Sequence, residues 1–113
     1  MSYEQVVRLT RPGPTITSFN RRELSTILGL YSRMLMSGQA RDYAIDHLSD
    51  RAVFSIFRRA SEQPLYRVVK RPADARRQGA WSVVSQSGGT LKRGHDLARV
   101  LQVVERKLIR VID

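Results

Sequence analysis

The chain has 113 residues, of which 42% are hydrophobic, and this is the size and composition of one soluble globular domain. Lysine and arginine outnumber aspartate and glutamate by 20 to 10, so the formal net charge of +10 favours an anionic partner: nucleic acid, an acidic protein or an anionic membrane surface. The absence of cysteine excludes disulfides, thiolate catalysis and cysteine-ligated zinc, and no run of about 18 apolar residues exists that could span a membrane.

Residues 1–16 are expected to form an N-terminal arm or an edge strand. Gln5 to Leu9 are rich in apolar residues and suit a short strand, but the sequence Arg11-Pro12-Gly13-Pro14 interrupts regular structure because proline lacks a backbone donor. The segment has neither the basic start and apolar core nor the small-residue cleavage site of an export signal. We therefore expect a cytoplasmic protein with one domain over residues 17–113.

A helix is predicted between Asn20 and Gly38. Asn20 is a suitable N-cap, Glu23 stands three residues later as in a capping box, and Gly38 is a natural residue to follow the last turn. The apolar residues between them recur at helical spacing and predict one buried stripe. This expected stripe consists of Leu24, Ile27, Leu28, Tyr31, Met34 and Leu35.

From Asp42 onwards the hydrophobic pattern changes to a period of two, which is typical of strands. The expected strands cover residues 42–48, 52–59, 65–71, 80–86 and 90–93. Short polar or glycine-rich segments separate most of them, so consecutive strands are expected to pair as antiparallel hairpins. Residues 72–79 are expected to be a polar loop with at most one helical turn.

A second helix is predicted after Gly94. Asp96 suits the positive end of the helix dipole, and the expected buried stripe consists of Leu97, Val100, Leu101, Val104 and Leu108. The β-branched residues near the end favour a final strand over Leu108 to Ile112, with the helix ending near Arg106. A helix that runs on is the alternative, because no glycine or proline interrupts it.

This order of elements predicts an α+β fold of two layers. An antiparallel meander of four to five strands is flanked in sequence by two amphipathic helices, and each helix can cover part of one sheet face. The other sheet face is then expected to be more open.

The stretch from Arg51 to Arg77 contains eight basic and two acidic residues, interleaved with aromatic ones. Positive charge beside aromatic rings suits nucleic acid. The candidate phosphate contacts are Arg58, Arg59, Arg67, Lys70, Arg71, Arg76 and Arg77, joined by Lys92 and Arg93 from the segment SQSGGTLKRGHD. The candidate stacking residues, provided that their rings face outward, are Phe57, Tyr66 and Trp81. Alternatively, these rings belong to the core or to a dimer interface, and the arginines form a solvated rim.

No motif predicts catalysis, a cofactor or a metal site. The glycine-rich segment lacks the spacing of a Walker-type loop, and the two histidines lie in different elements. The strands separate the two helices, which argues against a helix-turn-helix. We therefore expect a non-enzymatic protein that binds DNA or RNA through a basic sheet surface and loop. An accessory or adaptor protein that docks on an acidic surface of a larger assembly is the alternative.

Three segments carry a family resemblance: FNRRELSTILGLYSRM, RDYAIDHLSDRAVFSIFRRASEQPLYRVVKRP and LKRGHDLARVL. They resemble a family of small basic bacterial proteins, mostly alphaproteobacterial, that is catalogued as domain of unknown function 2794. The resemblance covers nearly the whole chain and implies no activity, cofactor or active site. The expected strands followed by a helix are also similar to the single-stranded-nucleic-acid platforms of the Pur-alpha and Whirly type. Those modules often pair, so this analogy of fold leaves a homodimer open.

Overall fold

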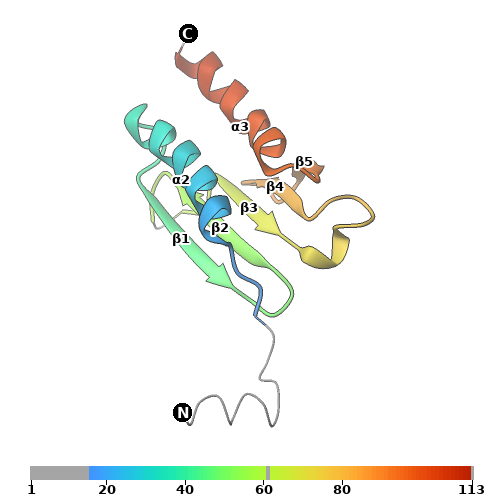
Figure 1. Ribbon diagram of the computed structural model, residues 1–113. Helices are drawn as coiled ribbons and strands as arrows, with labels where there is room; N and C mark the ends of the chain where they lie inside the picture. The colour runs from blue at the N-terminus through green and yellow to red at the C-terminus, as the bar shows by residue number, and fades with distance from the viewer. Residues whose placement is uncertain (1–15, 61, 113) are drawn as a thin grey trace, which may run out of the picture.

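The computed structural model describes residues 16–60 and 62–112, in which two helices cover one face of a five-stranded antiparallel sheet (Figure 1). In chain order the elements are α2 (Arg21–Met36), β1 (Asp42–His47), β2 (Ala52–Phe57), β3 (Tyr66–Lys70), β4 (Trp81–Ser85), β5 (Thr90–Gly94) and α3 (Leu97–Ile112). The strands follow one another in space as they do in sequence, so the predicted α+β meander is confirmed. The predicted strand over Gln5 to Leu9 lies outside the described residues.

Helix α2 begins and ends where its local sequence signals predict. The Asn20 side chain accepts a hydrogen bond of 2.8 Å from the Glu23 amide, and the Glu23 carboxylate accepts one of 2.9 Å from the Asn20 amide. This reciprocal capping box satisfies two amides that the helix itself leaves unpaired. At the other end Gly38 has a φ of +83°, a left-handed conformation that glycine adopts without a steric cost.

The buried stripe of α2 differs from the predicted one at two positions. Ile27, Leu30 and Met34 are fully buried, and Tyr31 lies beside them. Leu30 was not in the predicted stripe, whereas Leu35 was included and is 48% exposed. The buried residues Ile27, Leu30, Tyr31 and Met34 follow one another at spacings of three, one and three positions. The stripe that they form is centred away from Leu35, which therefore faces solvent.

Helix α3 continues to Ile112, so the predicted final strand over Leu108 to Ile112 is wrong. Leu108 is only 5% exposed and follows Val104 by one helical turn, which keeps it in the buried stripe. An ion pair of 3.0 Å between Arg33 of α2 and Glu105 also joins the two helices. Packing against α2 therefore outweighs the strand preference of the β-branched residues.

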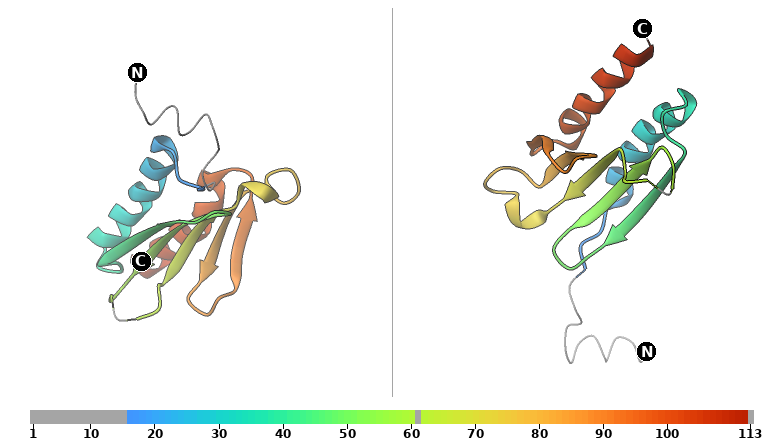
Figure 2. Two further views of the ribbon diagram at one scale, coloured as in Figure 1. Left: turned by 90° about the horizontal axis from the view of Figure 1, so that it is seen from below. Right: turned by 180° about the vertical axis from the view of Figure 1, so that it is seen from behind.

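One face of the sheet forms the core with the two helices, which lie on the same side of it in both views of Figure 2. Phe54, Ile56, Val68 and Val83 are fully buried on this face. Trp81 joins them at 6% exposure, so its ring does not face outward, which was the condition for its candidate stacking role, and the alternative of a core position holds. Its ring instead stacks on Phe19, with centroids 6.1 Å apart and planes at 11°.

The opposite face of the sheet is not covered by either helix (Figure 2, right). The pairing register places Val53, Val69 and Ser82 in one row across β2, β3 and β4 on this face. Ser55 and Arg67 form part of the neighbouring row. Although neither helix covers this face, its central side chains are largely buried, with Val53, Ser55, Val69 and Ser82 only 6–9% exposed.

Candidate functional site

The meander separates the candidate basic residues into groups at the two ends of the sheet. Strands β2 and β3 are antiparallel, with Ala52 opposite Lys70 at one end and Ile56 opposite Tyr66 near the other. The arginines that directly follow β2, Arg58 and Arg59, therefore lie at one end, whereas the basic residues that follow β3 lie at the other. Strands of five or six residues keep the two ends about 17–20 Å apart. The single basic surface predicted from sequence is thus divided.

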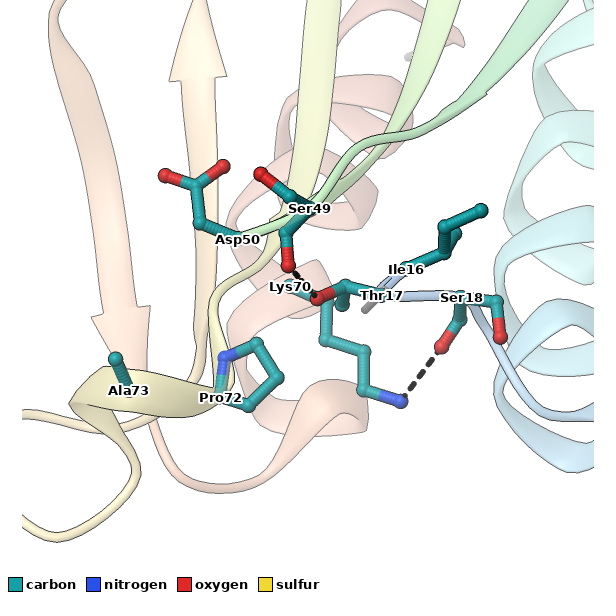
Figure 3. Close-up of a pocket in the computed structure, with 8 residues that line it drawn as sticks. All are labelled: Ile16, Thr17, Ser18, Ser49, Asp50, Lys70, Pro72 and Ala73. Atoms are coloured by element: carbon teal, nitrogen blue, oxygen red, sulfur yellow. Dashed lines mark hydrogen bonds between the residues drawn. The ribbon is translucent and has the colours of Figure 1, made fainter. Parts of the chain in front are cut away.

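Lys70 is engaged inside the fold. Its ammonium lies 2.7 Å from Glu23 Oε1 and donates to the Ser18 carbonyl at 2.9 Å, and it stands over the Trp81 ring at 5.8 Å from the centroid. Figure 3 shows the side chain directed towards Ser18 along a groove of about 510 Å³ that also involves Thr17, Ser49 and Pro72. The Lys70 charge is thus already paired, and only 19% of its side chain is exposed. Its contacts with Ser18 and Glu23 link the sheet to the start of α2 and to the segment before it.

Arg71 and Arg93 share one carboxylate. Arg71 Nη1 lies 3.0 Å from Asp50 Oδ2, and Arg71 Nε lies 3.9 Å from Asp74 Oδ2. The same Asp74 oxygen lies 3.7 Å from Arg93 Nη1 of β5. Asp74 is 17% exposed, so it connects the β3–β4 loop to β5 from a largely buried position.

The end of the β3–β4 loop lies directly against the junction between β5 and α3. Gly79 has a φ of +97°, and a Cβ built on it would meet the carbonyl carbon and oxygen of Gly94 at 2.1 Å and the His95 amide nitrogen at 2.6 Å. Only a glycine allows this approach of two backbones. Three amides, those of residues 77, 78 and 79, also converge on the Asp74 carbonyl at 2.9–3.1 Å and hold the loop in a tight turn. Arg76 and Arg77, whose side chains are exposed, precede this contact by three and two residues.

A hollow of about 440 Å³ opens at this junction. It is lined by Lys92, Arg93, Gly94, His95, Asp96, Arg99 and Val100. Asp96 caps α3, since its Oδ1 accepts from the Arg99 amide at 3.3 Å and its carbonyl accepts from the Val100 amide at 3.0 Å. We call the basic residues of the loop and the junction together the basic end. It consists of Arg71, Arg76 and Arg77 from the loop and Lys92, Arg93, His95 and Arg99 from the junction.

The three candidate stacking residues do not share a surface. Phe57 lies on the uncovered face opposite Asp42, at the end of the sheet away from the basic end. Tyr66 pairs with Ile56 on the helix side and packs against the core, and its burial raises the pKa of its hydroxyl. With Trp81 in the core, the predicted aromatic platform is not assembled in this fold.

The other predicted basic residues lie away from the basic end. Arg58 and Arg59 are exposed at the opposite end of the sheet, where Arg59 approaches Glu62 at 3.9 Å. Arg67 projects from the uncovered face, and its Nη2 donates to Gln63 Oε1 at 3.2 Å. The sequence predicted phosphate contacts from these three arginines together with Arg71, Arg76, Arg77, Lys92 and Arg93. It did not predict His95 and Arg99 as part of the site. The signal for these two was the sequence KRGHDLAR, in which basic residues stand on both sides of a helix start.

Within residues 16–60 and 62–112, no three potential metal-ligating side chains come together, and no helix is long and apolar enough to cross a membrane. A family model described as "Protein of unknown function (DUF2794)" matches residues 17–101. No curated protein and no solved structure matches the chain.

Proposed function

Because this chain belongs to the DUF2794 family, whose function is unknown, its membership supplies no activity, and we propose from the geometry that it binds nucleic acid in the cytoplasm without catalysis. The basic end makes the contacts, and it makes them mainly to phosphates. The observation that carries this proposal is the backbone contact of Gly79 with Gly94, because it joins two basic segments that are remote in sequence.

The charge balance of the basic end supports an anionic ligand. It contains six arginines and lysines together with one histidine, and the carboxylates beside them already have partners in the fold. Asp74 lies near Arg71 and Arg93, Asp50 pairs with Arg71, and Asp96 caps α3. Arg76, Arg77, Lys92 and Arg99 have exposed side chains. Closely spaced cations of this kind release condensed counterions when they neutralise phosphates, which is the main source of affinity in non-specific nucleic-acid binding.

The mode of binding follows from what the basic end lacks. Phe57 and Tyr66 lie towards the other end of the sheet, and Trp81, which pairs with Gly94, has its ring in the core. No candidate stacking ring is therefore exposed at the basic end, so base stacking contributes little and the affinity depends on the phosphate backbone. Backbone contacts carry no direct sequence information. The proposed interaction is therefore salt-dependent and tolerant of sequence, and it differs from the aromatic platform expected from sequence alone.

Three pairs of adjacent arginines allow a matched test of this proposal. Arg76 with Arg77 lies in the basic end, Arg58 with Arg59 lies at the opposite end of the sheet, and Arg21 with Arg22 lies in the first turn of α2; all six are exposed. Each pair is replaced by glutamine, so that the three variants lose the same charge. Binding of fluorescent single-stranded and duplex oligonucleotides is measured by anisotropy at about 50 mM salt.

We expect the change at Arg76 and Arg77 to weaken binding by about tenfold, because two charge-assisted contacts are lost. The other two variants should stay within about twofold of the unchanged protein. Equal losses in all three variants would mean that net charge alone drives binding and would contradict the assignment. Competition by polyglutamate that is as strong as competition by unlabelled oligonucleotide would favour the adaptor alternative, in which the partner is an acidic protein.

A further inference from the structure

The hollow at the β5–α3 junction differs from the rest of the basic end because several basic residues line the same space. Lys92, Arg93, His95 and Arg99 reach it from the end of β5 and the first turn of α3. Arg76 and Arg77, in contrast, lie on the β3–β4 loop and do not line it. Its volume of about 440 Å³ is within the range of small-ligand sites and exceeds what a single bound ion needs.

Most of the residues that line the hollow are basic, and Val100, which also borders it, is 1% exposed and presents almost no surface there. Three residues in it carry a permanent positive charge, against the one carboxylate of Asp96. That carboxylate is oriented by the Arg99 amide at 3.3 Å, and the nearby Asp74 is shared between Arg71 and Arg93. The hollow therefore keeps an excess of positive charge after its own fold contacts are counted.

An excess of more than one positive charge in one hollow matches a phosphate group with two negative charges better than a group with one. An internal phosphodiester of a nucleic acid carries a single negative charge, whereas a terminal phosphomonoester carries about 1.5 to 2 at neutral pH and has three acceptor oxygens. Arginine side chains suit such a group because they donate two parallel hydrogen bonds.

We propose that this hollow binds the terminal phosphate of a nucleic acid strand. Arg99 and Lys92 contact the phosphate. The Arg99 amide does not contribute to this site, because Asp96 Oδ1 already accepts its hydrogen bond. This inference rests on the proposed nucleic-acid binding by the basic end and adds a preference for strand ends to it.

The test compares oligonucleotides of one sequence that carry a 5′-phosphate, a 3′-phosphate or only hydroxyl ends, with binding measured by anisotropy. We expect one of the phosphorylated strands to bind about tenfold more tightly than the strand with hydroxyl ends, as for other hydrogen bonds to charged groups. Arg99→Gln should abolish this preference, so that the phosphorylated and hydroxyl-ended strands bind the variant with the same affinity. Arg106→Gln is the matched control, since Arg106 is an exposed arginine two turns further along α3 and does not line the hollow.

Equal affinity for all three strands, when they bind, would overturn the terminal-phosphate site and leave the proposed function intact. If no strand binds, the proposed function fails, and the hollow is then tested separately with a nucleoside 5′-monophosphate. An increase in melting temperature that the parent nucleoside does not produce, and that Arg99→Gln abolishes, would support the site by itself. The same melting temperature with and without the monophosphate would overturn it.

Discussion

Substituting alanine for Gly79 tests the backbone contact that assembles the basic end. Gly79 has a φ of +97°, where an L-residue is strained by about 1–2 kcal/mol. Its new Cβ would also stand 2.1 Å from the Gly94 carbonyl carbon and oxygen, which are backbone atoms that no side-chain rotation can move. Relieving such an overlap by a backbone shift costs about a further 1–3 kcal/mol. We therefore expect Gly79→Ala to lower the free energy of unfolding by about 2–5 kcal/mol.

Gly88→Ala is a matched control, because Gly88 has a nearly identical φ of +98° and nothing lies within 4 Å of its built Cβ. It should cost only the conformational strain of about 1–2 kcal/mol. In a domain of this size 1 kcal/mol corresponds to about 4 °C, so the two variants should differ in melting temperature by about 4–12 °C. Thermal unfolding followed by circular dichroism measures this difference. Melting temperatures within about 2 °C of each other would refute the close packing of the loop on the β5–α3 junction.

Three further predictions concern stability. Lys70→Met removes a largely buried partner of Glu23 and should lower the free energy of unfolding by about 1–3 kcal/mol in a urea titration. The variant should bind oligonucleotides as well as the unchanged protein. A stable variant that binds them poorly would mean that Lys70 contacts phosphate after all. Leu108→Ala should cost about 2–4 kcal/mol in the same titration, and a loss below about 0.5 kcal/mol would contradict the packing of α3 on α2. Burial first, and then the Asp42 carboxylate and Tyr43, raise the pKa of Tyr31 above its usual 10, so its contribution to stability is complete below that value and is lost as the pH rises through the raised pKa. Tyr31→Phe should flatten this alkaline decline of the unfolding free energy, and an unchanged decline would contradict the assignment.

Features that depend on neighbouring residues in sequence were predictable here. Asn20 and Glu23 identify the start of α2, and the period-two pattern identifies all five strands to within two residues at each end. The end of α3 was not predictable in the same way. The strand preference of its β-branched residues is local, whereas the burial of Leu108 depends on a helix about seventy positions earlier in the chain.

The candidate site required knowledge of contacts between distant residues. The division of the arginines between two ends follows from antiparallel pairing, but the residues that meet at one end depend on how the β3–β4 loop folds. The contact of Gly79 with Gly94 determines which residues meet at that end, and the local sequence around either glycine does not predict this contact. Sequence likewise does not distinguish Lys70, whose ammonium is paired with Glu23, from Arg77, whose side chain is exposed.

The salt dependence of binding tests the central claim most directly. For duplex DNA the logarithm of the binding constant falls linearly with the logarithm of the salt concentration, with a slope of about −0.9 for each phosphate neutralised. The account predicts that replacing Arg76 and Arg77 by glutamine makes this slope shallower by about 1.8, whereas the same replacement of Arg58 and Arg59 leaves it unchanged. An unchanged slope in the first variant, or an equal reduction in both, would contradict the assignment of phosphate binding to the basic end.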